Sequence, residues 1–210
     1  MGLRLLCATF IVLFTNTAMA IEEPKYTVLE NFGAIELRAY APRVVAETLV
    51  DGSLDNASSV GFKRIADYIF GNNTAHNGSN EKISMTAPVT TAPSADKRAS
   101  QKISMTTPVS IQETTGQWRM YFVMPSQYTL NTLPTPNNPA VSLRELPPSR
   151  MAVLRFSGLA GEEKTAKKIA ELLAWLKSKD ITPISEPELA RYNPPWTLPF
   201  LRRNEVMVAY

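Results

Sequence analysis

Side chains that act as nucleophiles or bind metals are scarce in this chain. Its 210 residues include one cysteine, Cys7, and one histidine, His76. Cys7 lies in an apolar N-terminal segment that we expect to be removed, so the mature chain would hold no thiol. Disulfides, thiolate nucleophiles and cysteine-based zinc or iron–sulfur sites are then excluded. A Ser-His-Asp triad would have to be built on His76 alone.

His76 lies in the middle of a polar tract, residues 72–80, whose Asn, Gly, Ser and Thr residues predict an exposed loop. An imidazole on such a loop can act as an axial metal ligand or as a general base. No neighbour in the sequence is suited to orient the ring. We therefore interpret His76 as a solvated loop residue and keep the ligand role as the alternative.

The first twenty residues have the pattern of a secretory leader. Arg4 supplies a positive charge, residues 5–14 form an apolar stretch too short to span a bilayer, and residues 18–20 form a small-x-small cleavage site. We expect cleavage before Ile21 and export to the periplasm or the exterior. An uncleaved anchor is the alternative.

Residues 21–210 would then form a single domain of sufficient length to bury a core. Arg4 is the only charge lost with the leader, so 21 of the 22 basic residues remain against 19 acidic ones. The net positive charge is therefore small and the basic residues are scattered along the chain, so we expect no nucleic-acid partner. No other segment is long enough to span a membrane, and the oligomeric state is not indicated.

A short phrase occurs twice, as Lys-Ile-Ser-Met-Thr-Ala-Pro-Val at 82–89 and with a single difference at 102–109. Each copy alternates apolar and polar residues, which is the period of a half-buried strand. The polar segment between them favours a surface loop. The pattern predicts two antiparallel strands joined by a long loop.

Other segments predict a mixture of strands and two helices. Residues 25–40 favour a hairpin, and strands are expected at 43–50, 118–124, 150–156, 184–192 and 205–210, with an irregular crossover at 125–149 that holds a short strand at 140–144. The first helix follows Ser53 or Asp55, carries the apolar stripe Phe62, Ile65, Ala66, Ile69 and Phe70, and ends at Gly71. The second helix, about 162–177, has the stripe Ala166, Ile169, Ala170, Leu173 and Leu176.

Strand, helix and paired strands therefore occur twice. This order predicts an α+β domain in which two similar halves, each with one helix, share one curved antiparallel sheet or distorted β-barrel. A pseudo-twofold arrangement of this kind leaves a groove between its halves, and such grooves are common ligand sites.

The repeated phrase, the segment from Leu133-Pro134 to Gly158, and the run Tyr192-Asn-Pro-Pro-Trp-Thr-Leu-Pro-Phe-Leu-Arg-Arg-Asn-Glu-Val206 resemble the SOUL haem-binding proteins. The resemblance covers nearly all of residues 21–210. It implies the two-halved fold above, within the same superfamily as gyrase-inhibitor-like small-molecule-binding domains. It also implies non-enzymatic, reversible, non-covalent binding of haem or a related tetrapyrrole.

The resemblance places the ligand in an apolar groove beside the first helix, where basic side chains meet the propionates. The matching residues here are Lys63 and Arg64, with Tyr68 beside them at the edge of the polar face; on composition alone, the two cations are ordinary solvated charges. Met85 and Met105 are candidate contacts to the iron, although methionine on the apolar side of a strand is usually core packing. His76 is the weak candidate for an axial ligand.

Two alternatives keep the fold and change the function. A small-molecule effector-binding or hydrolase domain, like some gyrase-inhibitor-like relatives, would use a buried acid, for which Glu205 and Glu47 are candidates. Glu205 is otherwise a strand-end residue that makes a hydrogen bond. A carboxylate of raised pKa facing a cleft would favour this hypothesis. The other alternative is an interaction protein with a filled interior and no small ligand.

Overall fold

The computed structural model describes residues 21–94 and 117–210. The strands are β1 (Tyr26–Phe32), β2 (Ile35–Tyr40), β3 (Arg43–Asp51), β4 (Asn73–Thr74), β5 (Val89–Pro93), β6 (Gln117–Val123), β7 (Thr135–Pro136), β8 (Val141–Leu146), β9 (Ser149–Phe156), β10 (Glu188–Arg191) and β11 (Asn204–Ala209). The helices are α1 (Leu54–Ile69), α2 (Glu162–Ser178) and the short 3₁₀ helix η1 (Pro199–Leu201).

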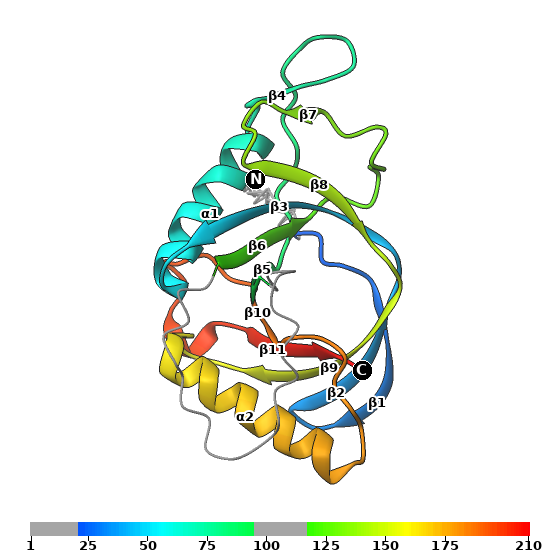
Figure 1. Cartoon of the computed structure of the whole chain (residues 1–210), viewed down its shortest axis with the longest axis vertical. Coiled ribbons are helices and arrows are strands. Elements are labelled where there is room, and N and C mark those ends of the chain that lie inside the picture. The colour runs from blue at the N-terminus through cyan, green and yellow to red at the C-terminus, as the bar shows by residue number, and fades with distance from the viewer. Residues whose placement is uncertain (1–20, 95–116) are drawn as a thin grey trace, which may run out of the picture.

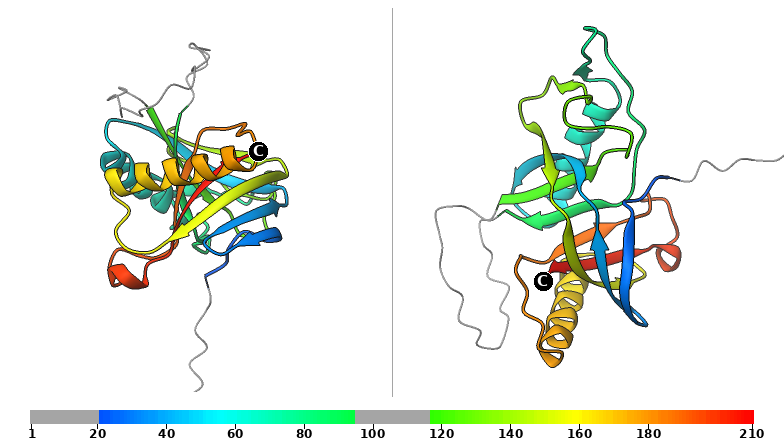
Figure 2. Two further views of the ribbon diagram at one scale, coloured as in Figure 1. Left: turned by 90° about the horizontal axis from the view of Figure 1, so that it is seen from below. Right: turned by 90° about the vertical axis from the view of Figure 1, so that its right-hand side faces the viewer.

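Within the described residues, nine strands form one antiparallel sheet in the order β1-β2-β9-β11-β10-β5-β6-β3-β8, and β4 pairs with β7. The sheet curls strongly into a half-barrel, with both helices on its convex side (Figure 1). Two further views show the same arrangement from below and from the side (Figure 2). The predicted α+β fold with one curved antiparallel sheet is therefore confirmed.

The predicted internal repeat is present as two equivalent units, β3-α1-β5-β6 and β9-α2-β10-β11. In each unit, the first strand pairs with the last, and the last pairs with the third. The two third strands, β5 and β10, pair with each other, with Thr90 opposite Ala190. One strand pair at the centre thus joins the halves into a continuous sheet.

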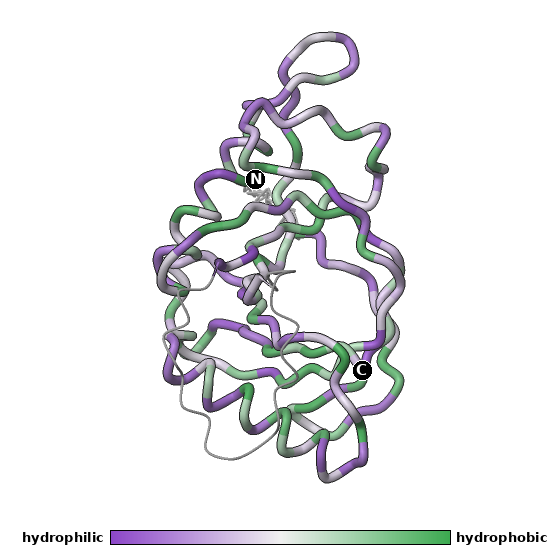
Figure 3. Tube along the Cα trace, viewed as in Figure 1, coloured by the Kyte–Doolittle hydropathy of each residue, from purple (hydrophilic) through white to green (hydrophobic). Residues whose placement is uncertain are grey.

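Successive side chains along a strand point to opposite faces of the sheet, so one face packs against the helices and the other is the concave face. Figure 3 shows hydrophobic and hydrophilic residues interleaved along the trace. Under α1, the core includes Ile65, Ile69, Met120 and Phe122; under α2, it includes Leu154, Leu172, Leu176 and Val206. Gly61 lets α1 approach β6 closely, because a Cβ there would lie 2.8 Å from Met120 Sδ.

The two halves also contact each other on the convex side. The carboxylate of Glu162, in the first turn of α2, accepts a hydrogen bond from the backbone N–H of Leu54, the first residue of α1 (3.1 Å). Arg191 on β10 donates to Ser58 Oγ on α1 (2.8 Å) and to the carbonyl of Ala160 before α2 (2.9 Å). The contacts of Arg191 thus tie the N-terminal part of α1 and the segment before α2 to the central strand β10.

One strand prediction is wrong. The first copy of the repeated phrase has no regular strand over residues 82–88, and β5 begins only at Val89. Its backbone is bonded to different partners along its length, since Ile83 N–H donates to the carbonyl of Ile69 and Ala87 N–H to that of Glu22. The second copy, 102–109, lies outside the described residues, and β5 pairs instead with β6.

The helices are found where predicted, with different buried stripes. Ser53 caps α1 as expected, accepting from Asn56 N–H. Tyr68, expected at the edge of the polar face, is buried, whereas Phe62 and Phe70 of the predicted stripe are exposed. On α2, Leu172 is buried and Ala170 is exposed. The sheet is curled, so the surface under each helix is not flat, and the buried stripe is rotated accordingly.

Candidate functional site

The outer side of α1 carries the two cations expected to face a carboxylated ligand. Lys63 is exposed. Arg64 is half-buried and its guanidinium donates to the carbonyl of Leu49 (2.9 Å) and to Thr48 Oγ1 (3.3 Å) on β3. The position of Arg64 is therefore fixed by the sheet, while Lys63 is free to follow a ligand.

Exposed apolar side chains lie on the same helix. Phe62 and Phe70 are 38% and 60% exposed. The ring of Phe62 packs on that of Phe122, with centroids 5.6 Å apart and planes tilted by 53°. We call Phe62, Lys63, Arg64 and Phe70 the α1 patch. It combines apolar area with positive charge.

Tyr68 and Met85 lie beneath α1 rather than on this patch. Tyr68 donates its hydroxyl to the carbonyl of Pro134 (3.0 Å) and belongs to the core under the helix. Burial, with smaller effects of Tyr128 and Glu81, raises the pKa of the Tyr68 phenol well above its ordinary value. Met85 is half-buried and packs against the same core. Both positions are those of packing residues.

The candidate iron ligands are not assembled around the patch. His76 is exposed in the loop that follows β4, at the far end of α1, where the N–H of Ala75 bonds the carbonyl of Ser79 (2.8 Å) (Figure 1). Met105 lies outside the described residues. Over residues 21–94 and 117–210, no group of three or more His, Cys, Asp or Glu side chains is close enough together to hold a metal ion.

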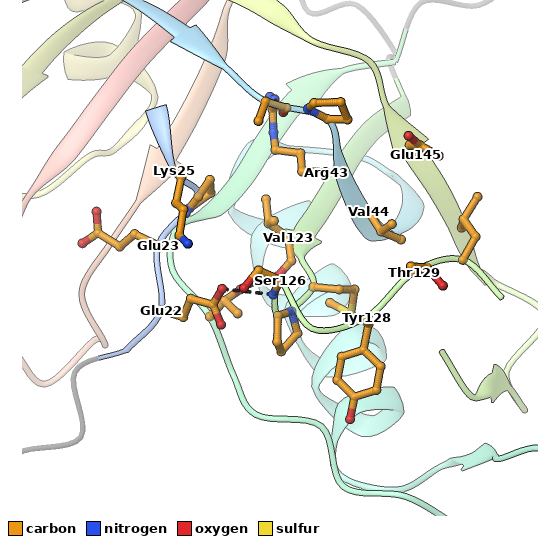
Figure 4. A pocket seen from close by; sticks show the side chains of 17 residues that line it. Glu22, Glu23, Lys25, Arg43, Val44, Val123, Ser126, Tyr128, Thr129 and Glu145 are labelled. Carbon is orange, nitrogen blue, oxygen red and sulfur yellow. Dashed lines mark hydrogen bonds between the residues drawn. The ribbon is translucent and has the colours of Figure 1, made fainter. Parts of the chain in front are cut away.

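A pocket of about 330 Å³ opens between the N-terminal segment 22–25, the start of β3 and the chain after β6 (Figure 4). Glu22 lines it and accepts a hydrogen bond from the N–H of Ser126 (3.0 Å). The charged side chains that line it are Glu22, Glu23, Lys25, Arg43 and Glu145. Its volume is at the lower end of the range for small-molecule sites, roughly 300–1,000 Å³.

The concave face holds a buried ion network centred on Glu205, which is fully buried. Both its carboxylate oxygens bond Arg38 (2.9 and 3.1 Å), Tyr192 donates to it (2.6 Å), and Arg203 donates to it (3.0 Å). Burial alone would raise the pKa of Glu205, but hydrogen bonds and charge from Arg38, Tyr192 and Arg203 hold it below its ordinary value. A general base in a hydrolase needs a raised pKa, so this geometry speaks against that role.

The other acidic candidate, Glu47, is also paired. Arg144 donates to both of its oxygens, the shortest contact being 2.8 Å, and Arg119 Nε lies 3.7 Å away. Sequence reasoning missed Glu188, which accepts from Tyr121 (2.6 Å) and whose pKa is raised by burial. It also missed Arg38. The signal for Arg38 was its position in β2, two residues before the buried Tyr40 and on the same side of the strand.

A family model described as "SOUL heme-binding protein" matches residues 21–99 and 94–209. The fold is similar to the C-terminal domain of EcmrR (TM-score 0.58, 11% identity, covering 88% of this chain and 96% of that chain). It is also similar to an uncharacterized conserved protein from Listeria innocua (0.57, 9%, 83% and 90%) and to a hydrolase from the same organism (0.51, 10%, 83% and 90%). At these identities the likeness concerns the fold alone.

EcmrR in complex with DNA is a further neighbour, of which this chain covers 56% (TM-score 0.58, 11% identity, 83% of this chain). None of the curated proteins compared with the chain matches it. Among the helices in the described parts of the chain, none has the length and apolarity needed to cross a bilayer.

Proposed function

The chain belongs to the SOUL heme-binding protein family, and we propose on this basis that it binds haem or a related tetrapyrrole reversibly and without catalysis. The observation that carries the proposal is the extent of the family match, which spans 21–209 and thus both halves of the fold. Because we expect a secretory leader at residues 1–20, we also propose that the protein acts after export, in the periplasm or outside the cell.

The α1 patch is the site that we propose for the macrocycle. A flat aromatic ring with two carboxylates needs apolar area for its faces and cations for its edge. Phe62 and Phe70 supply exposed apolar area, while Lys63 and Arg64 supply the charge. Arg64 is positioned by its bonds to β3, so it meets a carboxylate with little further ordering.

The residues fit the ring and its carboxylates better than they fit the iron. Met85 is packed in the core, and His76 lies on an exposed loop beyond the helix. Apolar burial and charge pairing would then supply most of the affinity. Under this proposal the metal-free ring, protoporphyrin IX, binds within about threefold of hemin, because the iron adds no strong bond.

A titration of the purified protein with hemin, followed by Soret absorbance, tests the proposal. Replacing both Lys63 and Arg64 with alanine is expected to weaken binding by roughly tenfold or more, since two cation–carboxylate contacts are lost. Lys177→Ala removes an exposed lysine of α2 and serves as the matched control, with unchanged binding. His76→Ala is expected to have little effect.

Three results would contradict parts of this proposal. No saturable Soret change beyond that given by an unrelated soluble protein would exclude haem as the ligand. Equal affinities of the Lys63/Arg64 double variant and the Lys177 control would move the site away from α1. A large loss of hemin affinity in His76→Ala, with protoporphyrin IX binding retained, would establish iron ligation by that residue.

A further inference from the structure

The connection between β10 and β11 exposes large apolar side chains. Within residues 194–201, which we call the tryptophan loop, Trp196, Leu198, Phe200 and Leu201 are 82%, 56%, 71% and 62% exposed. The loop contains three prolines and no charged residue. It stands out from the body of the molecule, in red, in both views of Figure 2. Side chains of this size are rarely exposed together on a protein that has no partner for them.

Five of the eight backbone carbonyls of the tryptophan loop accept hydrogen bonds within the protein. Its carbonyls accept from backbone N–H groups or from the guanidinium of Arg202; those with such partners belong to Pro194, Pro195, Thr197, Leu198 and Pro199. The prolines at 194, 195 and 199 have no N–H that would need a partner. The loop thus directs apolar side chains outward, while most of its carbonyls are bonded internally and three of its eight positions have no N–H.

The base of the loop is closed and charged. The N–H of Tyr192 donates to the carbonyl of Arg203 (3.1 Å), and the N–H of Arg203 donates to Asn193 Oδ1 (2.6 Å). Arg202 donates to loop carbonyls, while Arg203 pairs with Glu205 and Glu23. The loop is therefore bonded across its base, with its cations at the base and none at the tip.

These features match what a lipid bilayer requires more closely than what a protein partner requires. A segment that enters the interfacial region buries apolar side chains at the boundary of the acyl chains, while head groups and water bond the backbone groups that lack an internal partner. Tryptophan beside phenylalanine and leucine is the composition that anchors proteins at this depth. A protein interface usually has a polar and charged rim, and the loop carries no charged side chain.

We propose that the tryptophan loop inserts into the interfacial region of a lipid membrane and docks the protein there. Since Arg202 and Arg203 already have partners, apolar burial supplies most of the binding. The loop therefore partitions into neutral phosphatidylcholine vesicles as well as into anionic ones, with little dependence on salt. No residue of the loop belongs to the α1 patch, so this proposal does not depend on haem binding.

Co-sedimentation with phosphatidylcholine vesicles, with and without 30% phosphatidylglycerol, tests the proposal on the ligand-free protein. We expect binding to both compositions, with a blue shift of tryptophan emission and quenching by lipids brominated near the head group. Phe200→Ser with Leu201→Ser keeps Trp196 as the probe and is expected to weaken partition by roughly tenfold or more. Trp196→Ser is a second variant with the same expected direction.

Ile184→Ser is the matched control, because Ile184 is 75% exposed and lies outside the loop. Its vesicle binding is expected to equal that of the unchanged protein, and urea unfolding checks that every variant is folded. Sedimentation only with anionic vesicles, abolished by salt, would overturn the proposal, because charge would then dominate. So would the absence of binding, or equal binding by the loop variants and the Ile184 control.

Discussion

Replacing Glu205 with leucine is expected to lower the free energy of unfolding by about 3–5 kcal/mol, because it leaves a buried guanidinium without its carboxylate. The Arg38 side chain is 3% exposed, and its nearest other acid, Glu36, is bonded only through Arg38 Nε. The loss is a large part of the roughly 5–15 kcal/mol that stabilises a typical domain. Urea unfolding followed by circular dichroism would measure it.

Glu145→Leu is the matched control for this substitution. Glu145 is an exposed residue on β8, so its replacement should change the free energy of unfolding by no more than about 0.5 kcal/mol. If Glu205→Leu were no more destabilising than Glu145→Leu, the network on the concave face would have no role in linking β2 to β11 across β9.

The lowered pKa of Glu205 also determines how the network responds to acid. A carboxyl whose pKa is lower in the folded state contributes stability above its unfolded pKa, about 4.3, and this contribution is lost as pH falls through the folded value. The unchanged protein should therefore lose stability below about pH 4 more steeply than Glu205→Leu. Urea unfolding of both proteins at pH 6 and at pH 3 would measure this difference. Equal losses of stability in the two proteins between these pH values would contradict the prediction.

Phe122→Ala is expected to cost about 3–5 kcal/mol of the free energy of unfolding, since it leaves a cavity at a fully buried ring. Phe122 lies on β6 under α1 and supports Phe62 of the α1 patch. The same urea experiment measures the loss, and hemin affinity of the folded variant should fall with it if the patch is the ligand site.

Phe70→Ala removes an equal ring from a position that is 60% exposed, so its effect on unfolding should remain within about 0.5 kcal/mol. Comparable losses in the two variants would mean that α1 is not packed on β6 as the structure has it.

Local patterns identified most elements, because the period of apolar residues is set by the element itself. Residues 43–50 and 118–124 alternate in this way and are strands, and the pattern near Ser53 gave the start of α1. The phrase at 82–89 alternates equally well, yet its first part bonds the end of α1 and the N-terminal segment. The choice of a backbone partner depends on distant residues, and alternation does not contain that information.

The candidate site was predictable only in part. Lys63 and Arg64 follow from the resemblance and lie on the outer side of α1, but the assignment of Tyr68 to the same edge missed its burial against Pro134. The network of Glu205, Arg38 and Arg203 joins residues more than 160 positions apart in the chain, so no local spacing reveals it. Four exposed apolar side chains at 196–201 give no periodic signal either, because they lie in a turn.

The pairing of β5 with β10 has a consequence for how such a protein arises. Either unit on its own would leave its innermost strand as an open edge, and that edge is complementary to a second copy of the same unit. A symmetric dimer of one unit would thus already have the six central strands and both helices seen here, and joining the two copies in one chain would only remove the need for the monomers to meet. Covalent linkage also frees each copy to change separately, which accounts for one half carrying an arginine–glutamate network where its counterpart carries Tyr121.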